Sequence, residues 1–196
     1  MQIWFFVLTL ARPSARKRKL KDKKLSDLIR TKVGFKLNHI LVLESDKLYG
    51  GMTGIPGKPL MILSEAILKE LNKDELEYVI LHEAAHFKYH HPIILGILQI
   101  FLVLTGLYFV QFTTTFVAIF TGILFSFIYI QISRVTERQA ENFAASNMND
   151  PKGMLTAVNK FEKSWAKSPH LKLKKFLSWN ISYEEKRSIA KKYITR

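Results

Sequence analysis

The stretch that decides the fold is Val79-Ile-Leu-His82-Glu83-Ala-Ala-His86-Phe-Lys-Tyr-His-His91. It carries an HExxH pattern inside a predicted helix. Two histidines four residues apart lie on one helical face, about 6 Å apart along the axis at 1.5 Å per residue. Both imidazoles can therefore reach one metal ion. Glu83 projects beside them, placed to act on a metal-bound water rather than to bind the metal.

The helix around this pattern has a recognisable start. Asn72 is a favourable N-cap and Glu75 follows three residues later, which is a variant of the capping box. Apolar residues then recur at helical spacing. We predict a helix from Lys73 to about Tyr89, ending before Pro92. The alternative is a helix with two surface histidines and an exposed glutamate.

His90 continues the stripe of His82 and His86, but the sequence argues against a metal role for it. His82 and His90 are about 12 Å apart along the helix axis, too far to share one ion through bonds of about 2.1 Å. A third metal ligand must come from elsewhere in the chain.

The 196-residue chain keeps its apolar and charged residues apart. Its net charge is +14 and it has no cysteine, yet Pro92–Ser133 contains no Asp, Glu, Lys, Arg or His. The absence of cysteine excludes disulfides, thiol catalysis and cysteine-ligated metals.

The uncharged stretch predicts a membrane hairpin. As one helix, the 41 residues Ile93–Ser133 would be about 61 Å long, twice the roughly 30 Å hydrocarbon core of a bilayer. Two passes of about 18 to 20 residues fit better, with the turn near Gln111 and Thr113–Thr115. The alternative is a buried helical pair, but a domain of this size is too small to cover it.

The N-terminal region is apolar and then strongly basic. Met1–Ala11 is about half of the roughly 20 residues that cross a bilayer, so we expect it to dip into the interface. The alternatives are a clipped span or a segment that packs on the protein. Arg12–Lys36 holds eleven Lys and Arg against two Asp. Beside membrane segments, such a cluster marks the cytoplasmic face; nucleic acid, anionic lipid or a solvated arm are the alternatives.

We therefore predict two parts, an arm at residues 1–36 and a single metallopeptidase-like domain at residues 37–196 with its hairpin at 93–133. Ser26 is predicted to cap a short helix, Asp27–Val33, within the arm.

Short apolar runs before the motif helix predict a small antiparallel sheet. Strands are expected at Ile40–Leu43, Leu48–Thr53 and Leu60–Leu63, with a turn at Gly54–Gly57. Ser64 is expected to cap a helix from Glu65 to about Leu71.

An exposed strand of this sheet can hold an extended peptide through main-chain hydrogen bonds. Gly51, Met52 and Thr53 are therefore candidate substrate-binding residues. The alternative is a structural sheet that binds nothing.

Two glutamates, Glu137 and Glu141, follow the hairpin directly. Two spans return the chain to the starting side of the membrane, so these carboxylates can meet His82 and His86. One can complete the His₂Glu set of a catalytic zinc while the other orients a ligand histidine. The alternative is that they pair at the surface with neighbouring arginines.

Near the C-terminus, the sequence predicts a helix from Asp150-Pro151 to about Ala166. A capping box of Ser182 and Glu185 starts a last helix that runs to about Tyr193. Three residues of this region are candidates to polarise a scissile carbonyl: His170, Asn180 and Arg187.

Together these residues resemble the gluzincin membrane metallopeptidases typified by HtpX and the CAAX prenyl proteases. The resemblance covers about Leu48 to Ala145. Tyr49–Gly54 with Leu60–Leu68 is similar to the family's lead-in, Asn72–His91 to its "DEL…HE..H.K" helix, and Ser133–Glu141 to its "SR..E…D" segment. The resemblance implies that Glu137 is the third ligand of one zinc ion, with Glu141 where the family usually has aspartate.

The chain also departs from that family. The family often has Asp five residues after the second motif histidine, where this chain has His91. Its "HPS…R" segment is replaced here by Asn180–Arg187, and HtpX-type enzymes carry further spans before the motif helix. The chain resembles a compact version of the family.

The predicted fold is an α+β membrane protein. Its mostly helical zincin-like domain has a small antiparallel sheet, and the two-helix transmembrane hairpin lies between the HExxH helix and the third-ligand helix.

The predicted function is that of a multi-pass cell-membrane zinc endopeptidase, with its catalytic domain cytoplasmic and Glu83 as general base. Its partners would be a polypeptide substrate and the lipid bilayer, with no nucleic acid. The alternatives are an inactive zinc-bound scaffold or chaperone-like binder, and a nucleic-acid-binding protein with a membrane anchor.

Overall fold

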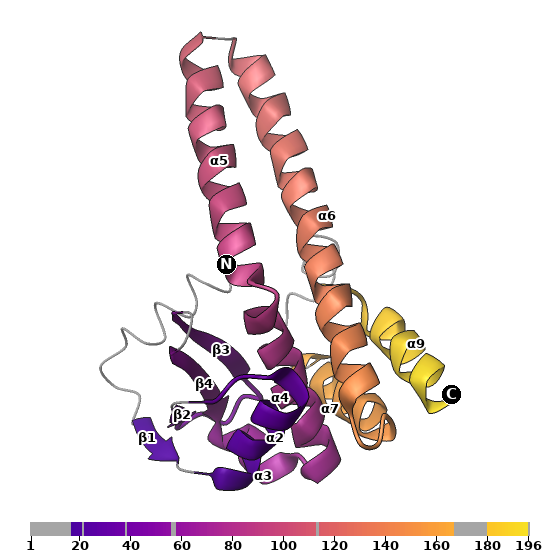
Figure 1. Cartoon of the computed structure of the whole chain (residues 1–196). Coiled ribbons are helices and arrows are strands. Elements are labelled where there is room, and N and C mark those ends of the chain that lie inside the picture. The colour runs from indigo at the N-terminus through magenta and orange to yellow at the C-terminus, as the bar shows by residue number, and fades with distance from the viewer. Residues whose placement is uncertain are drawn as a thin grey trace.

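The computed structural model describes residues 17–20, 22–37, 39–55, 58–112, 114–166 and 180–195. In chain order the elements are β1 (Lys17–Leu20), α2 (Lys23–Val33), β2 (His39–Leu43), β3 (Gly50–Ile55), β4 (Lys58–Ser64), α3 (Glu65–Glu70), α4 (Lys73–Lys88), α5 (His91–Phe112), α6 (Thr115–Asn147), α7 (Lys152–Ala166) and α9 (Tyr183–Ile194). They form an α+β domain from which α5 and α6 project together (Figure 1).

The sheet is mixed, so the predicted antiparallel sheet is wrong in part. Its strand order is β1-β2-β4-β3. β1 pairs antiparallel with β2, and β3 pairs antiparallel with β4, but β2 and β4 run parallel. The hydrophobic pattern of a strand is the same in either direction, so the sequence did not reveal that β4, rather than β3, lies beside β2.

The turn between β3 and β4 is shorter than predicted. Gly54 and Ile55 belong to β3, and Ile55 pairs with Lys58. Gly54 has φ 115, and a Cβ atom there would meet the backbone oxygen of Lys58 at 2.3 Å. Only glycine fits this position easily. Residues 56 and 57 of the predicted turn lie outside the described part of the chain.

The second half of the predicted basic arm contributes to the domain. β1 forms one edge of the sheet, and α2 buries Ile29 and Val33 in the common core. Ser26 is not the cap of this helix: Asp22 is, since its Oδ1 accepts a hydrogen bond of 3.2 Å from Leu25 N. The predicted interfacial segment Met1–Ala11 lies outside the described residues.

The capping box predicted for α4 is confirmed, whereas the one predicted for α9 forms only in part. At α4 the box is confirmed: Asn72 Oδ1 accepts from Glu75 N at 2.9 Å, and Glu75 Oε2 accepts from Asn72 N at 2.8 Å. At α9 the Oγ of Ser182 accepts from Glu185 N at 3.1 Å, as predicted. The Glu185 carboxylate instead accepts a hydrogen bond from Arg138 Nε on α6.

The core surrounds α4, which packs against α2, β3, α6 and α7. The two residues inside the HExxH pattern, Ala84 and Ala85, are completely buried, as are Ala140 and Ala144 of α6. Side chains of this size let two helices approach closely. α4 ends at Lys88, and the next turn is left-handed at His90, which has φ 56.

α5 and α6 are the predicted hairpin, and both are long and apolar enough to cross a bilayer. α5 has 22 residues, about 33 Å at 1.5 Å per residue, which matches the roughly 30 Å hydrocarbon core. Their large apolar side chains are exposed, as expected for helices that face lipid.

The predicted third-ligand helix is not a separate element. α6 has 33 residues, about 50 Å at 1.5 Å per residue, so it extends well beyond a bilayer core. Its C-terminal part runs down beside α4 and carries Glu137 and Glu141 (Figure 1). One rigid helix therefore links the apolar hairpin to the domain.

Candidate metal centre

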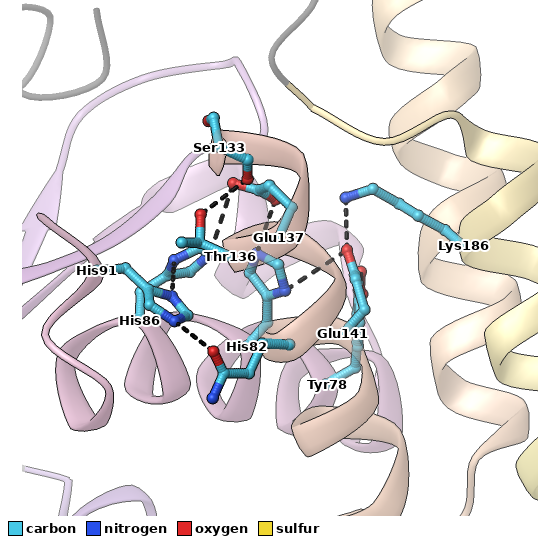
Figure 2. Close-up of polar contacts among 10 residues, drawn as sticks. Tyr78, His82, His86, His91, Ser133, Thr136, Glu137, Glu141 and Lys186 are labelled. Carbon is cyan, nitrogen blue, oxygen red and sulfur yellow. Dashed lines mark hydrogen bonds and ion pairs between the residues drawn. The ribbon is translucent and has the colours of Figure 1, made fainter. Parts of the chain in front are cut away.

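Three side chains from two helices converge at the lower end of the hairpin. His82 and His86 come from α4, and Glu137 comes from α6 (Figure 2). The two Nε2 atoms are 3.2 Å apart. Glu137 Oε2 lies 3.8 Å from His82 Nε2, and Glu137 Oε1 lies 3.6 Å from His86 Nε2.

These distances suit a single zinc ion. Tetrahedral ligands with bonds of about 2.1 Å are roughly 3.4 Å from one another. The two histidine nitrogens are 3.2 Å apart, and the two oxygens of Glu137 lie 3.6 Å from His86 and 3.8 Å from His82. One donor atom from each of the three residues lies within 4.8 Å of the others. Glu137 is 3% exposed. Its Oε2 has no hydrogen-bond partner among the described residues, which is unusual for a buried carboxylate oxygen. The donor set therefore fits the His₂Glu site of a zinc enzyme, which keeps a fourth position open.

Glu141 lies on the same face of α6, one turn beyond Glu137. Its Oε1 is 3.5 Å from His82 Nδ1 and 2.5 Å from Lys186 Nζ on α9. Its Oε2 accepts a hydrogen bond of 2.8 Å from the hydroxyl of Tyr78. The contact between His82 Nδ1 and Glu141 Oε1 is an ion pair without hydrogen-bond geometry. It places Glu141 beside the ring nitrogen that an orienting role would use. Figure 2 shows Glu141 between His82, Tyr78 and Lys186.

The carboxylates around His82 set its charge. Burial alone would lower the pKa of His82, but Glu141 and Glu137 outweigh it and raise the pKa to about 9. Burial and the neighbouring His82 and His91 hold the pKa of His86 well below its usual value. The centre is therefore rich in negative charge that a divalent cation would neutralise.

Glu83 is poised between its two protonation states. Burial, reinforced by Glu137 and Glu141 and opposed by His82, raises its pKa to about 7. A carboxyl group with a pKa near neutrality can accept a proton and return it. Burial likewise raises the pKa of Glu137.

Burial would raise the pKa of Glu141, but Lys186 and His82 outweigh it, so the pKa is lowered and Glu141 stays ionised. Burial would lower the pKa of Lys186, and Glu141 with Glu137 raises it instead. The two groups therefore form a buried ion pair behind His82.

The candidate substrate strand β3 is an edge strand next to α4. Gly51 and Met52 are buried, and Thr53 is half-buried. Met52 and Thr53 line a cavity together with His90 and Pro92 at the junction of α4 and α5. The predicted substrate residues thus lie beside the end of the motif helix.

Four further residues were candidates from the sequence: His90, Arg187, Asn180 and His170. His90 is exposed and is not part of the metal-ligand set found among the described residues. Arg187 donates a hydrogen bond of 2.5 Å to Glu162 of α7. Asn180 is half-buried in the segment before α9, and His170 lies outside the described residues.

Sequence reasoning missed Tyr78 and Lys186. Tyr78 precedes His82 by four residues and so shares its helical face, which is a pattern that the sequence offered. Lys186 is one of several lysines in α9, and nothing local distinguishes it, because its partner Glu141 is 45 residues away.

Comparisons with known proteins identify a family and a similar fold. The model of peptidase family M48 matches residues 14–178. No curated protein sequence matches. The crystal structure of S. mikatae Ste24p has a similar fold, with a TM-score of 0.68 at 18% sequence identity. The match covers 96% of this chain and 53% of that one, so this chain spans about half its length.

The family match confirms the resemblance to HtpX-like and CAAX prenyl protease-like enzymes, which was read from the motif helix and the segment after the hairpin. The chain belongs to peptidase family M48.

Proposed function

We propose that this protein is a membrane-embedded zinc-dependent endopeptidase whose site faces the cytoplasm. The family is one of zinc metallopeptidases, and His82, His86 and Glu137 would hold the ion. Two exposed apolar helices and a net charge of +14 support a membrane location with the basic domain on the cytoplasmic side.

When bound, a zinc ion supplies a Lewis acid that lowers the pKa of water and polarises a carbonyl group. Glu83 accepts a proton from the attacking water molecule. It then gives that proton to the nitrogen of the departing amine, so that one peptide bond breaks and one water is consumed. Glu141 holds His82 in place, and Lys186 keeps Glu141 ionised.

The substrate is proposed to be a membrane or unfolded protein bound in extended form. β3 is an edge strand beside α4, so its outer main-chain groups can pair with a peptide strand. Gly51, Met52 and Thr53 would contribute this contact. An edge strand with this role needs an unfolded or loosely structured partner, because only such a chain can add a strand.

The observation that carries the proposal is the convergence of His82, His86 and Glu137, with Glu83 in electrostatic interaction with His82 and Glu137. A Glu83→Gln variant keeps the volume of the side chain and removes the proton acceptor. We expect it to bind zinc like the wild type and to lose peptide hydrolysis of an unfolded model substrate by a factor of about 10² or more. Glu162→Gln, on the surface of α7, is the matched control and should retain activity.

The alternative, a zinc-bound scaffold without proteolytic activity, gives the opposite result. A scaffold does not need a proton acceptor, so wild type and Glu83→Gln would then behave alike. Equal and absent hydrolysis in both proteins, with zinc retained, would favour the scaffold.

A further inference from the structure

The ligand histidine His86 has a buried histidine as its neighbour. His91, the first residue of α5, places its Nδ1 3.0 Å from His86 Nδ1, and its Nε2 lies 3.1 Å from Gln139 Oε1 on α6. His91 is 1% exposed, and the ring of Tyr89 stacks on it with the centroids 5.7 Å apart. Figure 2 shows His91 beside His86, on the side away from His82.

We propose that His91 and Gln139 are positioning residues that hold His86 in the one tautomer able to bind the metal. This inference rests on the proposed zinc site and adds the chain of hydrogen bonds that prepares one of its ligands.

The direction of the hydrogen bonds follows from donor and acceptor chemistry. Gln139 presents its amide oxygen to His91 Nε2, and an oxygen only accepts, so His91 donates from Nε2. The reversed amide orientation would place the proton of His86 on Nε2, where it would block metal binding. The Nδ1 of His91 is then an acceptor, and His86 must donate from its own Nδ1. The lone pair of His86 is left on Nε2, the atom that faces Glu137 Oε1 at 3.6 Å and His82 Nε2 at 3.2 Å.

The two ligand histidines are thus supported by different chemistry. His82 rests against the ionised carboxylate of Glu141, whereas His86 rests against a neutral imidazole. The centre already contains the carboxyl groups of Glu83, Glu137 and Glu141. A neutral acceptor orients His86 without adding a further negative charge to a buried site.

The backbone explains how His91 reaches His86. A continuous α4 would place residue 91 on a different face, because five residues advance the helix by about 500° at 3.6 residues per turn. The left-handed conformation of His90, with φ 56, ends α4 and starts α5 in a new direction. As a result, His91, the first residue of α5, contacts His86 at the candidate metal centre.

The test is zinc affinity of the full-length protein in detergent, measured by competition with a chelator. His91→Phe keeps a ring and removes the acceptor. We expect zinc to bind about 10- to 100-fold more weakly. His91→Asn, which retains an acceptor oxygen, should recover part of this loss. His39→Phe at the start of β2, where the histidine is exposed, is the matched control and should not change affinity.

Gln139 provides an independent variant. Gln139→Leu removes the acceptor for His91 Nε2–H and should weaken zinc binding, whereas Gln139→Glu keeps an acceptor and should not. If His91→Phe fails to fold, as judged by circular dichroism, the Gln139 pair decides the question.

Nitrogen-15 NMR of the histidine rings gives a readout that packing alone would not change. In the zinc-loaded wild type we expect the proton of His91 on Nε2 and that of His86 on Nδ1. A proton on His91 Nδ1, or wild-type zinc affinity in both His91→Phe and Gln139→Leu, would overturn the inference and leave the proposed function intact. A wild-type protein that holds no zinc would overturn the proposed function, and this inference with it.

Discussion

Lys186 Nζ lies 2.5 Å from Glu141 Oε1. This ion pair joins α9 to the carboxylate that contacts His82 at the candidate metal centre. The exposed fractions of the two side chains are 12% and 0%. The pair spans α9 and α6, so α9 takes part in the electrostatics of the candidate site, whose proposed ligands lie on α4 and α6.

Removing Lys186 is therefore expected to destabilise the protein. Lys186→Met leaves the Glu141 carboxylate buried without its cation, which costs about 3–5 kcal/mol in comparable sites. The measurement is the free energy of unfolding of the zinc-free protein in detergent. Arg187→Met is the matched control next to it, because the side chain of its partner Glu162 is 44% exposed. That change should cost at most about 1 kcal/mol. Equal effects of the two changes would contradict the role of Lys186.

Glu137 is expected to be indispensable for zinc binding. Glu137→Ala removes one of the three proposed ligands, so affinity should fall by more than the roughly 10- to 100-fold typical of residues that only support a ligand. Metal analysis of the purified protein and chelator competition measure this directly. Glu162→Ala, a surface change on α7, should retain one zinc per chain. Unchanged stoichiometry and affinity in Glu137→Ala would mean that the third ligand is another residue.

We predict that the ionisation of Glu75 makes the stability of the fold depend on pH. Burial alone would raise its pKa, but hydrogen bonds from Lys160 Nζ at 2.6 Å and Asn72 N at 2.8 Å outweigh it and lower the pKa below 4.5. A carboxyl group whose pKa is lower in the folded state stabilises the fold above its unfolded-state pKa. This stabilisation is lost as the pH falls below about 4.5 and through the folded-state pKa.

The check is a comparison of Glu75→Gln with wild type, both zinc-free. At pH 7 the variant should be less stable by roughly 1–2 kcal/mol, and the difference should shrink as the pH falls below 4.5. A difference that stays constant from pH 7 to acid pH would show that the ionised form of Glu75 is not what stabilises the start of α4.

The close contact of α7 with α4 at Gly153 predicts that a larger side chain at this position lowers the stability of the fold. A Cβ atom at this position would lie 2.6 Å from Asp74 Cβ and 2.7 Å from the backbone carbon of Asp74. The backbone of α4 cannot move away easily, so Gly153→Ala should destabilise by about 1–3 kcal/mol. Gly106→Ala in α5 is the matched control, because no atom lies within 4 Å of its added Cβ. Thermal unfolding distinguishes them, and a stabilising Gly153→Ala would contradict the close approach.

Leu104 tests the membrane hairpin. It is exposed near the middle of α5, where an arginine costs about 2.5–3.5 kcal/mol on insertion into a bilayer. Leu104→Arg should therefore lower the fraction of protein that resists alkaline extraction from membranes. Leu104→Phe, which keeps the site apolar, should insert like wild type. Full membrane retention of the arginine variant would argue against α5 as a lipid-facing span.

The sequence by itself determined the features that depend on a few neighbouring residues. The capping box of Asn72 and Glu75 and the i, i+4 spacing of His82 and His86 are local properties of one helix. The uncharged run after Pro92 likewise predicted two apolar helices, because the thickness of the hydrocarbon core limits the length of each span.

Only the tertiary structure decided which distant groups meet. Residue spacing put Glu137 and Glu141 on one face, but the packing of α6 on α4 decided that Glu137 faces both Nε2 atoms and Glu141 faces His82 Nδ1. The same holds for Lys186 behind Glu141, for His91 against His86, and for β4 beside β2. The local sequence around each of these residues is compatible with many partners. The partner that each residue contacts is decided by how complete helices and strands pack closely together.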